Sequence, residues 1–134
     1  METIMNRKLS IAFATAIVGL TLAGSVQAYD ADWKRGRVYY RMVCTACHEA
    51  KAGGAIAPTT KTKAEWAAYI KADKHAKGKE SLKHYVSKQY RDSIKATNKA
   101  AAKFADVPEQ ELLEDIKAFV NKGAKDGDAP AKCS

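Results

Sequence analysis

Two cysteines and a histidine form the most reactive group in this sequence. Cys44, Cys47 and His48 make the pattern Cys-x-x-Cys-His. Two thiols about one helical turn apart can add to the two vinyl groups on one edge of a porphyrin, while the adjacent imidazole reaches the iron. The motif therefore predicts one covalently attached haem c, linked through Cys44 and Cys47, with His48 as the proximal axial ligand of the iron.

Other interpretations of these thiols fit the sequence less well. A thioredoxin-like dithiol belongs near a βαβ pattern, and no strand pattern precedes Cys44. A structural zinc site would need a second pair of Cys or His residues at close spacing, which the chain lacks. The third cysteine, Cys133, makes the number odd, which argues against a framework of disulfides. Three roles remain open for Cys133: a free thiol, half of an intermolecular disulfide, or an iron ligand.

The elements that must position these groups are predicted to be helices. Residues 30–48 favour a helix, because Trp33, Tyr40 and Cys44 recur at helical spacing and share one face. The segment 49–62 contains two consecutive glycines and a proline, which favour a loop. We therefore expect the attachment motif to end the first helix.

Two further helices are predicted in the middle of the chain. Thr62 and Glu65 form a Ser/Thr-x-x-Glu capping box at the start of one helix, which we expect to end at Gly78. Apolar residues at helical spacing predict another helix from Leu82 towards Ile94.

The last helix has the clearest signals. Asp106 can cap it, Pro108 suits its first turn, and Gly123 can end it. Its apolar residues share one face that we expect to be buried: Leu112, Leu113, Ile116, Phe119 and Val120. The whole pattern predicts an all-α domain of about four helices around one haem.

The N-terminal segment is predicted to be an export signal. Arg7 and Lys8 precede an apolar run, and small residues follow it where a signal peptidase cleaves. The alternative is a retained membrane anchor, but the run is shorter than the roughly 20 residues that span a bilayer. We expect residues 1–28 to be removed and the rest to be exported to a bacterial periplasm, with no membrane span after cleavage.

The charge of the chain limits its partners. The sequence has 23 basic and 15 acidic residues, a net charge of +8, which becomes +7 when Glu2, Arg7 and Lys8 leave with the signal. Export argues against nucleic acid, so we expect redox protein partners with acidic docking surfaces. A dense basic stretch surrounds the end of the second helix, formed by Lys71, Lys74, Lys77, Lys79 and Lys83. Whether the protein forms oligomers does not follow from the sequence.

A family resemblance extends beyond the attachment motif. Gly36 and Tyr40 complete the pattern Gly-x-x-x-Tyr-x-x-x-Cys-x-x-Cys-His, which resembles the N-terminal helix of class I c-type cytochromes. The last helix resembles the C-terminal helix of that family, which implies that Phe119 packs near Gly36. The resemblance also implies that the carbonyl of Pro58 accepts a hydrogen bond from Nδ1 of His48. It places a cytochrome c domain over residues 29–123, followed by a polar tail over 124–134.

The chain departs from the family at the second axial ligand, which is usually a methionine ahead of the last helix. The methionines of this chain are Met1, Met5 and Met42. The first two leave with the signal peptide, and Met42 lies directly before the attachment cysteines, on the wrong side of the haem. We therefore do not expect a methionine as the distal ligand.

The remaining histidines are the next candidates for the distal position. His84 lies among apolar residues of a predicted helix, whereas His75 lies in a lysine-rich helix end. We expect His84 to be the ligand, with His75 next. A lysine from residues 95–103 and an open site are the alternatives. A second imidazole would lower the reduction potential, and an open site would let ferrous iron bind CO or NO.

These residues predict a monohaem electron carrier between redox proteins rather than an enzyme. A chain of this length leaves no room for a second cofactor or an elaborate substrate pocket. The alternatives are a haem-bearing subunit of a periplasmic redox enzyme and a five-coordinate gas-binding haem protein. Four aromatic residues could pack on the haem or reach its propionates, or serve as ordinary core: Trp33, Trp66, Tyr69 and Tyr85.

Overall fold

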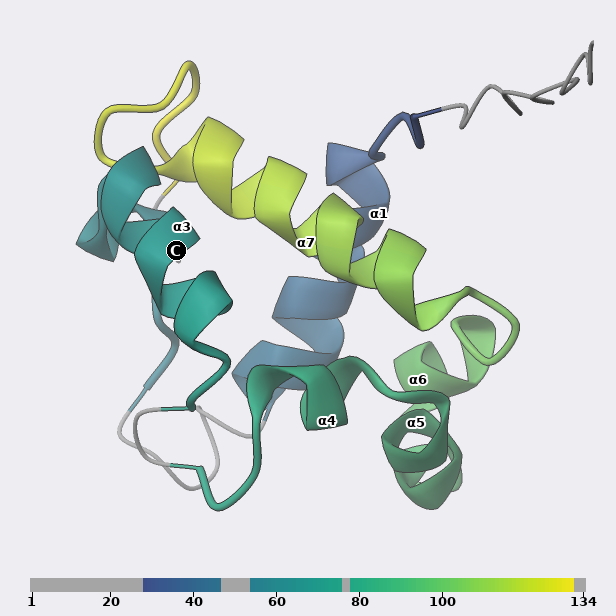
Figure 1. Cartoon of the computed structure of the whole chain (residues 1–134). Helices are drawn as coiled ribbons and strands as arrows, with labels where there is room; N and C mark the ends of the chain where they lie inside the picture. Colours follow the sequence, from purple (N-terminus) through teal and green to yellow (C-terminus); the bar gives the residue numbers. More distant parts are fainter. Residues whose placement is uncertain (1–27, 47–53, 76–77, 132–134) are drawn as a thin grey trace, which may run out of the picture.

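The computed structural model describes residues 28–46, 54–75 and 78–131, and this part of the chain contains helices, turns and loops but no strand (Figure 1). This confirms the expected all-α class. In chain order the elements are α1 (Trp33–Tyr39), η1 (Tyr40–Cys44), η2 (Pro58–Thr60), α3 (Lys63–Ala72), α4 (Leu82–Val86), α5 (Lys88–Ile94), α6 (Lys99–Lys103) and α7 (Glu109–Gly123). The expected export signal lies outside the described residues up to residue 27.

The first helix begins later than the sequence pattern predicts. Asp32 caps it, because its side chain accepts hydrogen bonds from the backbone N–H groups of Lys34 and Arg35. The chain then continues through η1, a single π-helical turn, and helical backbone extends to Ala46. Cys44 is the last residue of η1. Local π-helical turns of this kind are frequent at functional sites.

α1 and α7 cross in close contact at Gly36 (Figure 1). A Cβ atom at Gly36 would lie 2.0 Å from the carbonyl oxygen of Asp115 and 2.8 Å from the backbone nitrogen of Ile116. Only glycine permits this approach of two backbones. The crossing agrees with the family resemblance, but Gly36 faces the backbone one turn before Phe119. The ring of Phe119 packs on Tyr40, with the ring centroids 5.4 Å apart.

α3 begins as expected and ends earlier than expected. The capping box is present, with the Thr62 hydroxyl accepting from the backbone of Glu65 and the Glu65 carboxylate accepting from the backbone of Thr62. The helix stops at Ala72 rather than at Gly78, because Asp73 adopts a left-handed conformation with φ 51°. An Asp73 carboxylate oxygen then accepts from the backbone N–H of Lys83 at 2.9 Å, which ties the end of α3 to the start of α4.

The single helix predicted from Leu82 towards Ile94 is wrong. Ser87 is extended, with ψ 150°, and separates α4 from α5. Its hydroxyl accepts from the backbone N–H of Tyr90 and so caps α5. A serine that caps a new helix competes with continuation of the old one, which explains the break. α6 follows, capped by the side chain of Asn98.

α7 buries the face that the sequence predicts. All five of its apolar residues are buried: Leu112, Leu113, Ile116, Phe119 and Val120. Pro108 stands at the N-cap position without a side-chain cap, so Asp106 does not cap this helix as predicted. The chain after Gly123 turns back, and the backbone of Ala131 bonds to Gly123 on one side and to Thr59 on the other. None of the described helices is long and apolar enough to cross a membrane.

Candidate functional site

One of the three predicted attachment residues lies within the described part of the chain. Cys44 ends η1, is half-buried, and packs against the hydrophobic core. Cys47 and His48 lie outside the described residues, as does Cys133. Cys44 is therefore the residue from which the geometry of the site can be built.

Tyr39 connects the Cys44 end of the first helix to α4. Its side chain is fully buried, and its ring packs edge-on against Phe104 at 5.0 Å. Its hydroxyl donates to the carbonyl oxygen of Tyr85 at 2.6 Å. Burial raises the pKa of Tyr39 above its usual value, so this phenol stays protonated. The helical segment that ends at Cys44 and α4 are thus held side by side.

Both candidate distal histidines pack on the same tyrosine. The ring centroid of Tyr85 lies 5.3 Å from that of His75 and 5.3 Å from that of His84. Tyr90 completes the cluster, 5.4 Å from His84 and 5.2 Å from Tyr85. Through Tyr85 and its bond from Tyr39, this cluster is linked to the helix that carries Cys44.

The hydrogen bonds distinguish the two histidines. Nδ1 of His75 accepts from the backbone N–H of Gly78 at 2.8 Å. A neutral imidazole that accepts at Nδ1 carries its proton on Nε2, and that nitrogen then has no lone pair for a metal. Iron ligands usually have the opposite arrangement, donating from the second ring nitrogen. Within the described part of the chain, the imidazole of His84 packs on the rings of Tyr85 and Tyr90, and its backbone N–H donates to the Ser81 hydroxyl at the cap of α4.

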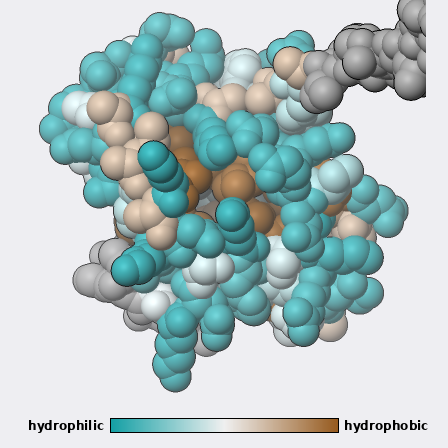
Figure 2. Space-filling view, in the orientation of Figure 1, coloured by the Kyte–Doolittle hydropathy of each residue, from teal (hydrophilic) through white to brown (hydrophobic). Residues whose placement is uncertain are grey.

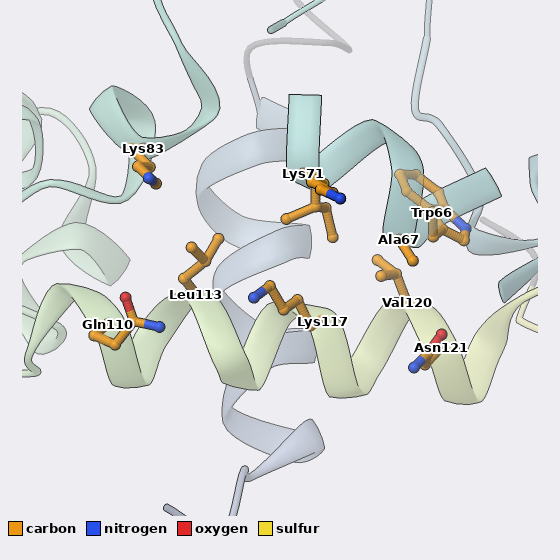
Figure 3. A pocket seen from close by; sticks show the side chains of 10 residues that line it. Trp66, Ala67, Lys71, Lys83, Gln110, Leu113, Lys117, Val120 and Asn121 are labelled. Atoms are coloured by element: carbon orange, nitrogen blue, oxygen red, sulfur yellow. The ribbon is translucent and has the colours of Figure 1, made fainter. Parts of the chain in front are cut away.

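A cavity of about 530 Å³ lies between α3, α4 and α7. Figure 2 shows it as an apolar hollow ringed by hydrophilic residues, and in Figure 3 the first helix runs behind it. Its volume falls within the range of roughly 300–1,000 Å³ that is typical of small-molecule and cofactor sites. Its walls carry Trp66, Ala67, Ile70, Lys71, Lys83, Gln110, Leu113, Lys117, Val120 and Asn121.

Trp66 lines the cavity and also packs against the helical segment that ends at Cys44. Its ring lies 6.5 Å from the ring of Tyr40, which is one turn before Cys44. The Trp66 indole N–H donates to the carbonyl oxygen of Pro58 at 2.7 Å. This is the carbonyl that the family resemblance assigns to His48, and a carbonyl oxygen has a second lone pair for another donor. The cavity wall therefore contacts the helical segment that ends at Cys44.

The other residues considered from the sequence have different surroundings. Tyr69 packs edge-on against Trp66 at 5.9 Å, and Trp33 lies under the ammonium groups of Lys34 and Lys122. Of the basic stretch, Lys71 and Lys83 reach the cavity. The other described members, Lys74 and Lys79, are exposed, and Lys77 lies outside the described residues.

Two buried charged residues were not predicted from the sequence. Arg91 is 1 % exposed, and its guanidinium donates to the carbonyl oxygens of Ser87 and Phe104. Its Nη2 has no hydrogen-bond partner among the described residues. Arg91 thus joins the break between α4 and α5 to the end of α6.

Asp115 is the second buried charge, and it is fully buried in α7. Its carboxylate accepts from the Tyr29 hydroxyl and from the backbone N–H of Asp32, both at 2.7 Å, and it pairs with the Arg35 guanidinium. Glu111 adds a second carboxylate, 3.3 Å from Arg35. A carboxylate with three donors is fully satisfied, so Asp115 serves to hold the start of the described chain against α7.

Comparison with known proteins identifies a family that this chain matches. The family model described as Cytochrome c matches residues 33–124, from the first residue of α1 to the residue after α7. No curated protein and no solved structure matches the chain.

Proposed function

This chain belongs to the cytochrome c family, and we propose that it is a monohaem electron carrier of the bacterial periplasm whose haem is held by Cys44, Cys47 and His48. The family binds haem c covalently and transfers electrons, so the chain is a haem-bearing electron-transfer protein. The observation that carries the assignment of residues is the position of Cys44. It is a half-buried thiol at the end of a helical segment that packs against α7 at Gly36, and Tyr40, one turn before it, packs against Trp66 of the cavity wall.

The described residues fit a bound haem. Trp66, Ile70, Leu113 and Val120 give the cavity apolar walls that can cover a porphyrin face. Trp66 links this wall to the helix that ends at Cys44. When bound, the haem supplies an iron that takes up and releases one electron. The chain contributes the thioether anchors, the axial ligands and the exclusion of water from the porphyrin.

We assign the distal position to His84 rather than to His75. Nδ1 of His75 is already engaged as an acceptor by Gly78, which supports this order. The lysines of residues 95–103 give less support, because Lys95, Lys99 and Lys103 are all exposed. Two imidazole ligands stabilise ferric iron more than the usual histidine and methionine pair, so we expect a lower reduction potential than that pair gives.

The partners and the location follow from charge and from the expected export signal. A net charge of +7 after loss of residues 1–28 would attract acidic redox partners and make the association rate depend on ionic strength. A carrier of this kind exchanges electrons across the protein surface without binding a substrate, so we propose no catalytic residues.

The attachment is tested by mass spectrometry of the exported protein. We expect a chain that begins at Tyr29 and carries the mass of one haem. Cys44→Ala and Cys47→Ala should each lose one thioether link, and Cys133→Ala is the matched control that should keep both. An exported chain without added haem mass would end the assignment.

The distal ligand is tested by a pair of histidine variants. We expect His84→Ala to change a low-spin absorption spectrum to a high-spin one and to allow CO to bind the reduced protein. His75→Ala is the matched control, because His75 also packs on Tyr85 and its loss should leave the spectrum low-spin. A high-spin, CO-binding wild type would instead favour the five-coordinate gas-binding protein.

A further inference from the structure

Two of the lysines that line the cavity have no carboxylate partner within the described part of the chain. Lys71 comes from α3 and Lys83 from α4, and both line the cavity between α3, α4 and α7 (Figure 3). Neither forms an ion pair with any of the described residues. The third lysine of the wall, Lys117, differs from them because it pairs with Glu114 at 2.8 Å.

The cavity wall is positive and otherwise uncharged. Of its ten residues, three are lysines and none is acidic. Gln110 and Asn121 are its other polar residues, and the rest are apolar. Two unpaired cations beside an apolar surface favour an anion with an apolar body, because the anion neutralises the charge while its body covers the surface.

Haem c has this combination of properties. Its porphyrin face is apolar, and it carries two propionate carboxylates on the edge away from the vinyl groups. Thioether links at Cys44 and Cys47 would fix the vinyl edge at the end of the first helix, which leaves the propionate edge to be held by other elements. We propose that Lys71 and Lys83 each pair with one haem propionate, an inference that rests on the proposed attachment of haem.

This pairing has a structural and an electrochemical consequence. The two lysines lie on different helices, so the propionates would join α3 to α4 and add to the bond between Asp73 and Lys83. A carboxylate beside an ammonium group at an apolar wall stays ionised to lower pH. A propionate that titrates makes the reduction potential depend on pH around its pKa, so the pH of that inflection reports whether the pairing exists.

The experiment compares four forms of the holoprotein. The reduction potential is measured from pH 4 to pH 9 for the wild type, for the double variant Lys71→Gln/Lys83→Gln, for Lys71→Arg/Lys83→Arg and for Lys117→Gln. In the plot of reduction potential against pH, we expect the inflection of the double variant to lie about 1–3 pH units above that of the wild type. This is the change in pKa expected when a positive charge next to a carboxyl group is removed. Lys117→Gln should leave the inflection in place, and Lys71→Arg/Lys83→Arg should restore it.

The control variant makes the outcome specific. All these substitutions are at side chains that are at least partly exposed, and Lys117→Gln removes the same charge from the same wall. An inflection that is the same in the double variant, in Lys117→Gln and in the wild type would overturn the pairing. In that case haem mass still present on all three proteins would leave the proposed function intact, whereas a wild type without haem would overturn both.

Discussion

The contact between the first and last helices can be tested at Gly36. We expect Gly36→Ala to destabilise the protein, although alanine is the better helix former by about 1 kcal/mol. The reason is steric: the added Cβ atom would lie 2.0 Å from the Asp115 carbonyl oxygen, whereas Cβ contacts under 3.0 Å are essentially never seen. The obstacle is backbone, so no change of rotamer can relieve it.

The expected loss of stability is the difference between two opposing effects, the cost of overpacking and the gain in helix propensity. The two helices must separate by about 1 Å at the crossing to accept the methyl group. Overpacking of this kind costs typically about 1–3 kcal/mol and sometimes more. Because the obstacle is rigid backbone, we expect the cost of Gly36→Ala to lie at the upper end of this range. The hydrogen bonds that Asp32 and Arg35 donate to Asp115 should also weaken as the helices separate. After the helix-propensity gain we expect a net loss of about 2–3 kcal/mol, which lowers Tm by roughly 10–20 °C in a domain of this size.

The assay is thermal unfolding of the holoprotein, followed by circular dichroism. Arg37→Ala is the matched control, because Arg37 is the exposed neighbour of Gly36 in the same helix and its loss should change stability by less than about 0.5 kcal/mol. If Gly36→Ala melts at or above the wild-type temperature, the backbone contact at Asp115 does not exist in solution and the packing argument fails.

Three further predictions concern the polar contacts of the fold. Asp115→Asn should cost about 3 kcal/mol in urea unfolding, because it leaves the Arg35 guanidinium without its buried partner, whereas Glu114→Gln on the same helix should cost little. Burial, and next the hydrogen bond to Asp115, raise the pKa of Tyr29 from 10.0 to about 12. Because the folded state holds this proton more tightly, the stability that Tyr29 contributes is present below pH 10 and is lost between pH 10 and 12. Unfolding free energies measured across that interval should fall less steeply for Tyr29→Phe, and equal slopes would contradict the shift. Thr62→Ala should cost about 1 kcal/mol by removing the capping box of α3, and an unchanged midpoint in urea would show that the cap contributes nothing.

Short-range patterns predicted the parts of the fold that depend on neighbouring residues. The capping box at Thr62 and Glu65 needs only residues three positions apart, and it is present. The buried face of α7 follows from helical periodicity, which the packing confirms. The break at Ser87 was missed because the apolar pattern continues across it. A serine can either lie inside a helix or cap the helix that follows. Whether Ser87 is helical or extended therefore depends on what the following helix packs against.

The distinctions within the site required the folded chain. The residue type does not distinguish His75 from His84. In the folded chain, the backbone N–H of Gly78 donates a hydrogen bond to Nδ1 of His75. Likewise, Lys71 and Lys83 belong to a long basic stretch, and only the packing of α3 and α4 against α7 brings these two to one cavity. Contacts between residues far apart in the chain decide both cases, and no local pattern encodes them.

The sequence alone determined the family, the covalent haem and the helical class, because attachment chemistry and helical periodicity depend on residues a few positions apart. The tertiary structure alone decided that Asp115 and Arg91 are buried and that the cavity wall is positive. Burial of a charge depends on which distant groups surround it. That arrangement forms only when α7 crosses the first helix at Gly36 and the intervening helices pack around the two.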